Sequence, residues 1–293
     1  LEREIKYFEL SHLFTQWGGE FCPKIVANTK NGEKRIFGWD DRSDGEKYKN
    51  FLSVFLPQLV KFLKEKGVFD KCYFHLTDEP ELKDIDSYRK CRDMVKTYIE
   101  GRPTMDALSN YEFYRNGLVD VAVPVLSATH RFLNEKHGEL FTYYCTPQHP
   151  YYTNRSLSMP LLRTRILGVQ MYQVGVNGFL HWGYNFYKTQ YSVDNIDPYR
   201  DTSAGGCFSS GNSFIVYPSE SGVYASLRAR AIAEGFTDYR ALKTLEKLIG
   251  KDKVLDFLSK NRIEGFNEYP RNDRVFRLFR EKINSIIETI VKS

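Results

Sequence analysis

Short apolar runs alternate with longer amphipathic segments along most of the chain. In residues 46–66 the apolar side chains recur at helical spacing, for example Phe51, Phe55 and Phe62, which predicts a helix that Pro57 should kink. Further helices are expected at 82–98, 157–174 and between 225 and 290, with breaks at Gly250 and Gly265. The apolar runs expected to form strands are 7–14, 72–76, 104–108, 119–125, 140–145, 178–182 and 214–217.

Strands that alternate with helices in this way predict βαβ units and a parallel sheet. The strands are short and end in polar or aromatic residues, and the chain has neither a GxGxxG motif nor a P-loop. We therefore favour a (β/α)8 barrel of the TIM type over a doubly wound nucleotide-binding sheet. No repeat or linker divides the sequence, so we expect one domain over 1–293.

Composition excludes several classes of protein. Aromatic residues make up 15% of the chain, enough large apolar side chains to exclude disorder. The net charge of +5 is small and evenly spread, which argues against a nucleic-acid partner, and no apolar run reaches the roughly 18 residues of a membrane span. The five cysteines form no CxxC motif, which favours reduced thiols and a cytoplasmic location.

Polar and aromatic residues gather where the expected strands end. In a parallel barrel these ends meet at one mouth, where catalytic groups lie. Rings that stack on sugars, together with amides and carboxylates that bind hydroxyls, are typical of a carbohydrate site. The candidates, in chain order, are Trp17, Asp78, Glu79, Asp106, Asn110, Pro124, Tyr143, Tyr144, Trp182, Tyr184 and Asn185.

Each of these features also has a purely structural explanation. Asp-Glu-Pro commonly starts a helix, with Asp78 as the N-cap and Pro80 in the first turn, and barrel strands bury aromatic rings as core. His12, His75 and His181 lie within strands without an HxH or HExxH pattern. We expect them to be hydrogen-bonded interior residues, and we expect no metal site.

Six segments make the chain recognisable when they are read together. They cover nearly the whole chain, and their ordered set is far more specific than any one motif. In order they are YFELSHLFTQWGG, KCYFHLTDEP, DALSNYEFY, FTYYC, GFLHWGYNFY and FIVYP. This set resembles a bacterial barrel family catalogued as domain of unknown function 4091, which is related to glycoside hydrolase family 123, the β-N-acetylgalactosaminidases.

The resemblance implies a retaining hydrolase in which the substrate's own 2-acetamido oxygen attacks the anomeric carbon. Carried onto this sequence, it makes Glu79 the general acid/base and Asp78 the group that orients the acetamide N–H and stabilises the oxazolinium. It also suggests that Tyr144, in preference to Tyr143, binds the acetamide carbonyl and that Trp182 lies beneath the sugar. An internal nucleophile and proton transfer require no cofactor. Such an acid should have a raised pKa, and Asp78 a lowered or ordinary one.

The sequence departs from the family pattern in two ways. If Asp78 and Glu79 end barrel strand four, then 7–14 is strand three, and the first two strands and the family's common N-terminal β-sandwich are missing. We therefore expect a natural protein that is longer at its N-terminus, because open strand edges are costly. In the alternative, 18–45 hides the missing pair, with 24–27 and 35–39 as the only strand candidates. Asn212 also stands where related sequences lead us to expect Asp.

Two other functions remain open at this level. A second enzymatic hypothesis keeps Glu79 as acid/base and recruits Asp106 as nucleophile or base, with carboxyl groups about 5–5.5 Å apart. A non-enzymatic hypothesis is a barrel that only binds glycans. Both keep a carbohydrate as the partner, and the sequence gives no indication of oligomeric state.

Overall fold

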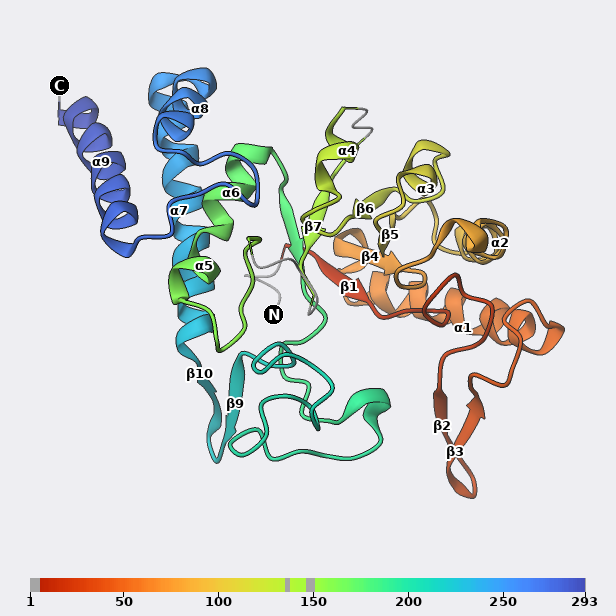
Figure 1. Ribbon diagram of the computed structural model, residues 1–293. Coiled ribbons are helices and arrows are strands. Elements are labelled where there is room, and N and C mark those ends of the chain that lie inside the picture. The colour runs from red at the N-terminus through yellow and green to blue at the C-terminus, as the bar shows by residue number, and fades with distance from the viewer. Residues whose placement is uncertain (1–5, 135–137, 146–150, 293) are drawn as a thin grey trace. The chain divides into compact units, whose positions relative to one another are not determined.

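The computed structural model describes all of residues 1–293 except 1–5, 135–137, 146–150 and 293. The chain forms two compact units, Leu1–Thr142 and Tyr143–Ser293 (Figure 1), and each is described by itself. The expected single domain over 1–293 stays a prediction.

A four-stranded parallel sheet organises the first unit, in the order β1-β4-β5-β6. The three strands β4, β5 and β6 are buried along their whole length, as expected of a parallel sheet covered on both faces. A parallel bridge joins Ala122 in β6 to Leu140, just before β7 (Phe141–Tyr143). The sheet strands are β1 (Phe8–Leu10), β4 (Cys72–His75), β5 (Thr104–Ala107) and β6 (Val121–Val123).

The helices of the first unit follow the predicted amphipathic pattern. The first, α1 (Glu46–Glu65), buries Tyr48, Leu52 and Leu56 and runs on through Pro57. The expected helix 82–98 is a 3-10 turn, Leu82–Asp84, followed by α2 (Ile85–Lys96). Two short helices, α3 (Tyr111–Arg115) and α4 (Thr129–Leu133), were not predicted, because five residues are too few to show a period. This unit also contains a 3-10 turn at Phe69–Lys71.

The polar stretch 18–45 contains an antiparallel hairpin of β2 (Ile25–Thr29) and β3 (Gly32–Phe37). Both strand candidates in this stretch are confirmed, but they form a sheet of their own and add nothing to the parallel sheet. Among the described residues β1 is an edge strand paired with β4. The mixed α/β fold with a parallel sheet is confirmed, whereas the closed barrel stays a prediction.

The second unit is built around the long helix α7 (Leu227–Ile249). The predicted helix 157–174 begins later and is divided into α5 (Leu161–Arg165) and α6 (Leu167–Val174), and both pack on α7. Gly250 ends α7 with a positive φ of 86°, which confirms the predicted break. The other elements of this unit are β8 (Gly178–Leu180), a 3-10 turn at Gln190–Ser192, the hairpin β9 (Val216–Ser219) with β10 (Gly222–Ala225), α8 (Lys251–Lys260) and α9 (Asp273–Lys292).

One buried carboxylate joins three helices of this unit. Asp238 on α7 is 1% exposed and accepts hydrogen bonds from Arg165 on α5 and Arg280 on α9, each at 2.8 Å.

Helices α6 and α7 cross where both carry glycine. A Cβ on Gly168 would lie 1.9 Å from the carbonyl oxygen of Gly235, so only hydrogen fits there. Among the described residues, none of the helices is both long and apolar enough to cross a membrane.

The crossing of α6 and α7 gives a stability prediction. Gly168→Ala should destabilise the protein by roughly 1–3 kcal/mol or more, because the new methyl group meets backbone that cannot move without separating the helices. Gly138→Ala is the control, since its Cβ would meet only a carbonyl oxygen at 3.8 Å. Urea unfolding of both variants measures the difference. Equal stabilities for the two variants would contradict this packing.

Candidate functional site

Asp78 and Glu79 lie in the turn that follows β4, in the first unit. The backbone of this turn is fixed on two sides: Trp17 donates its N–H to the carbonyl of Asp78, and Glu79 donates its N–H to the carbonyl of Ala107, both at 2.7 Å. Glu79 has a φ of 48°, a left-handed conformation that is costly for a residue with a side chain. The turn thus departs from the strand alternation that would point the two carboxylates in opposite directions.

The helix-start explanation of Asp-Glu-Pro does not apply. The first helical turn after β4 begins later, and a reciprocal capping box caps it, formed by the side chains of Glu81 and Asp84. Asp78 and Glu79 therefore precede the helix and are not used in capping it.

Asp78 is half-buried, and Glu79 is exposed. Gln16 donates its amide Nε2–H to Oδ2 of Asp78 at 2.9 Å. Burial and the negative charges of Asp106 and Glu79 raise the pKa of Asp78 to about 7, against the smaller lowering effects of Gln16 and His75. The expectation of a lowered or ordinary pKa for Asp78 was wrong, because it left out the burial of this side chain and the negative charge of Asp106.

Asp106 in β5 is that third carboxylate, and it is fully buried. Its Oδ2 accepts from the backbone N–H of Thr77 at 2.9 Å and from the Thr77 hydroxyl at 3.0 Å. Its Oδ1 faces Nε2 of His75 at 3.4 Å, an ion pair that is longer than a normal hydrogen bond. The structure therefore places Asp106 beneath the acid pair, as a support for it, and not at a surface where it would contact a substrate.

Glu9, His12 and His75 bring their ligand atoms within 4.8 Å of one another, which raises the question of a metal. His75 uses Nδ1 for Glu9 at 2.9 Å, and its Nε2 faces Asp106. Burial lowers the pKa of His75, but Asp106 and Glu9 more than offset this and raise it to about 10. Glu9 and Asp106 thus face the two ring nitrogens of His75, and the His12 ring packs against the His75 ring with the centroids 4.2 Å apart. Burial and His75 lower the pKa of His12 to about 4.

The loop that carries Gln16 and Trp17 packs directly on the turn that contains Asp78 and Glu79, which we call the acid turn. Trp17 has a φ of 58° and is 57% exposed, so its ring is available to a ligand. A Cβ on Gly19 would lie 2.9 Å from Cγ2 of Thr77, which shows how closely the two segments approach. Asn110 caps α3, since its Oδ1 accepts from the N–H of Glu112 at 3.1 Å, and its contact with a substrate stays a prediction.

Pro124, the last candidate in the first unit, accepts a hydrogen bond from the Thr142 hydroxyl through its carbonyl at 2.9 Å, and the other predicted residues belong to the second unit. Tyr143 and Tyr144 are buried, and Tyr144 packs against Phe179 and His181 with ring centroids 4.8 and 5.2 Å away. The Tyr144 hydroxyl has no hydrogen-bond partner among the described residues. Burial raises the pKa of Tyr144 to about 12, so this phenol keeps its proton and can act as a donor.

Trp182 is 41% exposed and packs its ring against Phe208 and Phe186, at 4.8 and 5.5 Å. Tyr184 and Asn185 follow it and are also exposed. This segment therefore presents an aromatic and amide surface of the kind that the sequence predicts for sugar binding.

Asn212, which stands where related sequences led us to expect Asp, is fully buried. Its amide donates to the Ser156 hydroxyl at 3.0 Å, and its backbone carbonyl accepts from the buried Arg155 at 2.5 Å. In this structure it holds a loop together.

Sequence reasoning missed Gln16, Thr77 and His75 as parts of the site. Gln16 stood beside Trp17 in the recognised segment, so a signal existed for it. The roles of Thr77 and His75 depend on Asp106, which lies 29 residues beyond Thr77, and no local pattern reports such a contact.

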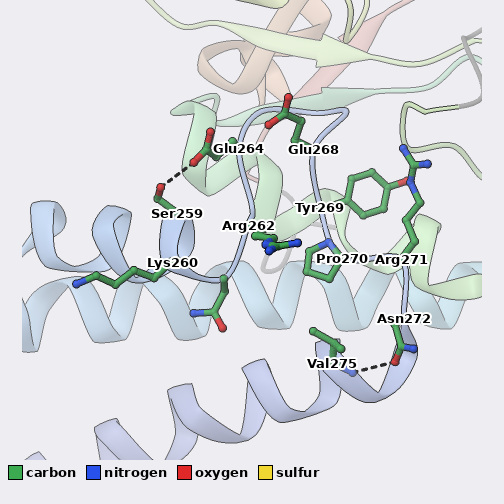
Figure 2. A pocket seen from close by; sticks show the side chains of 11 residues that line it. Ser259, Lys260, Arg262, Glu264, Glu268, Tyr269, Pro270, Arg271, Asn272 and Val275 are labelled. Carbon is green, nitrogen blue, oxygen red and sulfur yellow. Dashed lines mark hydrogen bonds between the residues drawn. The ribbon is translucent and has the colours of Figure 1, made fainter.

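A separate hollow of about 720 Å³ lies in the second unit, between the end of α8 and the start of α9 (Figure 2). Glu268 and Tyr269 line it, and the side chain of Glu264, another lining residue, accepts from Ser259 at 2.7 Å. None of the predicted site residues lines this hollow.

The profile described as "Glycoside hydrolase 123, catalytic domain" matches residues 2–245. No curated protein sequence matches this chain significantly. Among solved structures, the chain is similar to a family 123 glycoside hydrolase from Clostridium perfringens, whose structural analysis concerns glycolipid glycan hydrolysis. The two share 16% identity with a TM-score of 0.65 over 92% of this chain, which spans 49% of that protein.

The raised pKa of Asp78 predicts how the stability of the protein depends on pH. In the unfolded chain Asp titrates near 4, so between about pH 4 and pH 7 the folded state holds a proton that the unfolded state has lost. The wild type should therefore lose stability as the pH rises through this window. Asp78→Asn does not ionise and should unfold at a higher temperature than the wild type at about pH 8, but at nearly the same temperature at about pH 4.

Thermal unfolding at both pH values tests this, with the exposed Asp93→Asn as the control. A constant difference between Asp78→Asn and wild type at the two pH values would show that Asp78 has an ordinary pKa.

Proposed function

Because the chain belongs to the glycoside hydrolase 123 family, we propose that it is a retaining glycoside hydrolase acting on a β-linked 2-acetamido-2-deoxy sugar, with an N-acetylgalactosaminide favoured. The observation that carries this proposal is the pair Asp78 and Glu79 in one turn after β4, with its backbone fixed by Trp17 and Ala107. The glycolipid glycans named for the Clostridium perfringens protein are the substrate source that we extend to this chain.

The proposed mechanism assigns one task to each carboxyl group. The exposed Glu79 protonates the glycosidic oxygen while the acetamide oxygen of the substrate forms a bond to the anomeric carbon, which breaks the bond to the leaving group. Asp78 accepts a hydrogen bond from the acetamide N–H and balances the positive oxazolinium. Glu79, now a carboxylate, takes a proton from water as that water opens the oxazolinium with net retention.

The environments of the two groups support this division of tasks. Asp78, with a pKa near 7 in the free chain, gains most from a neighbouring cation, because its own ionisation is otherwise opposed by burial and by Asp106. Glu79 is exposed and can reach a bond in the substrate.

The competing two-carboxylate mechanism requires Asp106 to reach the sugar. Both carboxylate oxygens of Asp106 already face other protein groups: Oδ2 accepts two hydrogen bonds from Thr77, and Oδ1 lies 3.4 Å from Nε2 of His75. We therefore favour substrate assistance over a mechanism with Asp106 as nucleophile or base.

We further propose that Tyr144 donates its hydroxyl to the acetamide carbonyl of the substrate and that Trp17 and Trp182 offer faces for sugar rings. The buried Tyr144 hydroxyl without a partner among the described residues supports the first assignment, and the exposure of both tryptophans supports the second. Tyr184 and Asn185 are proposed as further contacts from the same exposed segment as Trp182.

A panel of nitrophenyl glycosides tests the proposed substrate. We expect hydrolysis of the β-N-acetylgalactosaminide and none of the β-galactoside, because the latter lacks the internal nucleophile. Glu79→Gln should lower kcat by about 100-fold or more with a nitrophenyl leaving group. The exposed Glu65→Gln is the matched control. Glycan binding that survives Glu79→Gln, with no hydrolysis by the wild type, would instead identify a binding module.

The Tyr144 assignment has a test that keeps the packing intact. Tyr144→Phe retains the ring that contacts Phe179 and His181 and removes only the hydroxyl. We expect kcat/KM for the N-acetyl substrate to fall by about 10-fold or more, the loss of one transition-state hydrogen bond. Tyr143→Phe serves as the comparison, and a larger loss in that variant would reverse our preference between the two tyrosines.

A further inference from the structure

Three charged side chains from three neighbouring strands form a line beneath the acid turn. Glu9 lies in β1, His75 in β4 and Asp106 in β5, and these strands are adjacent in the sheet. His75 is 2% exposed; its Nδ1 lies 2.9 Å from Glu9 and its Nε2 lies 3.4 Å from Asp106. A buried cation between two carboxylates is strongly constrained, because removing either partner leaves an uncompensated charge.

The line continues into the backbone of the acid turn. The second oxygen of Asp106 accepts from both the N–H and the hydroxyl of Thr77, the residue before Asp78. The carbonyl of Ala107, the residue after Asp106, accepts from the N–H of Glu79. Two consecutive residues of β5 thus hold the turn on both sides of Asp78, and the other oxygen of Asp106 faces His75.

Other titratable groups face this line. His12, from the segment after β1, packs its ring against His75 with the centroids 4.2 Å apart. Tyr88 and Cys91 of α2 both interact electrostatically with Asp106, as does Asp78. Of these groups, Asp78 is the one that the proposed reaction requires to be ionised.

We propose that His75 is a positioning residue, which through its contacts with Glu9 and Asp106 fixes the turn and favours the ionised form of Asp78. The proposal rests on the proposed hydrolysis for its kinetic test, but not for its spectroscopic one. The positive charge of His75 lowers the pKa of Asp78. Without that charge, Asp78 holds its proton to higher pH.

Two substitutions at position 75 separate the two contacts of the ring. His75→Gln carries an amide nitrogen at the reach of Nε2 and can still donate to Asp106, whereas His75→Asn reaches only as far as Nδ1 and can still donate to Glu9. We expect kcat to fall by about 10-fold or more in His75→Asn and by less in His75→Gln, with little change in KM. In both variants the acidic limb of the pH–rate profile should move to higher pH. His130→Gln, in the exposed histidine of α4, is the control.

A purely structural role would lower the melting temperature without moving the acidic limb, and that result would overturn the proposal. Equal losses of kcat in the Gln and Asn variants would also overturn it. Loss of wild-type activity with EDTA, restored by Zn²⁺, would show that Glu9, His12 and His75 bind a metal, and would overturn it as well.

NMR gives a readout that needs no activity. In the wild type, ¹⁵N spectra at about pH 8 should show both ring nitrogens of His75 protonated, and the ¹³C titration of the Asp78 carboxyl should move to higher pH in His75→Gln. If the wild type hydrolyses no aryl glycoside, the proposed function fails and these two spectra still decide the inference. A neutral His75 ring, or an unchanged Asp78 midpoint, would contradict it; the wild-type ring spectrum does so even if the variants fail to fold.

Discussion

A carboxylate removed from water must be hydrogen-bonded and electrically balanced, and Asp106 meets both conditions in a way that fixes the rest of the site. Its hydrogen bonds come from Thr77 and its positive charge from His75, which in turn faces Glu9. These contacts cross the sheet from β1 to β5 and place the turn with Asp78 and Glu79 at the end of β4. The strained backbone at Glu79 persists because it is held by this framework.

The same buried charge sets the chemistry of the pair. Burial of Asp78 and the negative charge of Asp106 oppose the ionisation of Asp78 in the free protein, and a cation that forms beside it would favour that ionisation. That difference between ground state and transition state is the condition for catalysis. Glu79 is exposed, and it is the group that we propose for proton transfer to a leaving group. If the acetamide of the substrate is the nucleophile, as we propose, no second carboxylate is needed across the ring, and this agrees with the position of Asp106 inside the sheet.

Much of this arrangement could be predicted from the sequence. The apolar run CYFHL predicted β4, which is confirmed, and the structure places the acid pair in the turn after this strand. That this pair forms the site stays a prediction, based on the gathering of strand ends at one edge of a parallel sheet. The family resemblance was confirmed by the profile match over residues 2–245. The burial of Asp106 was not predictable, since it depends on Thr77 and His75, whose distance from Asp106 in the chain hides the contact. The raised pKa of Asp78 was missed because it depends on the burial of Asp78 itself and on the nearby charge of Asp106.

The central claim is that the acetamide of the substrate is the nucleophile and that Asp78 serves the cation it forms. The most direct measurement is the hydrolysis rate of nitrophenyl β-N-acetylgalactosaminides whose acetyl group carries none, one, two or three fluorine atoms. Each fluorine weakens the carbonyl oxygen as a nucleophile without removing the group. Our account predicts that kcat falls steeply along this series, whereas rates that do not depend on fluorine content would contradict it.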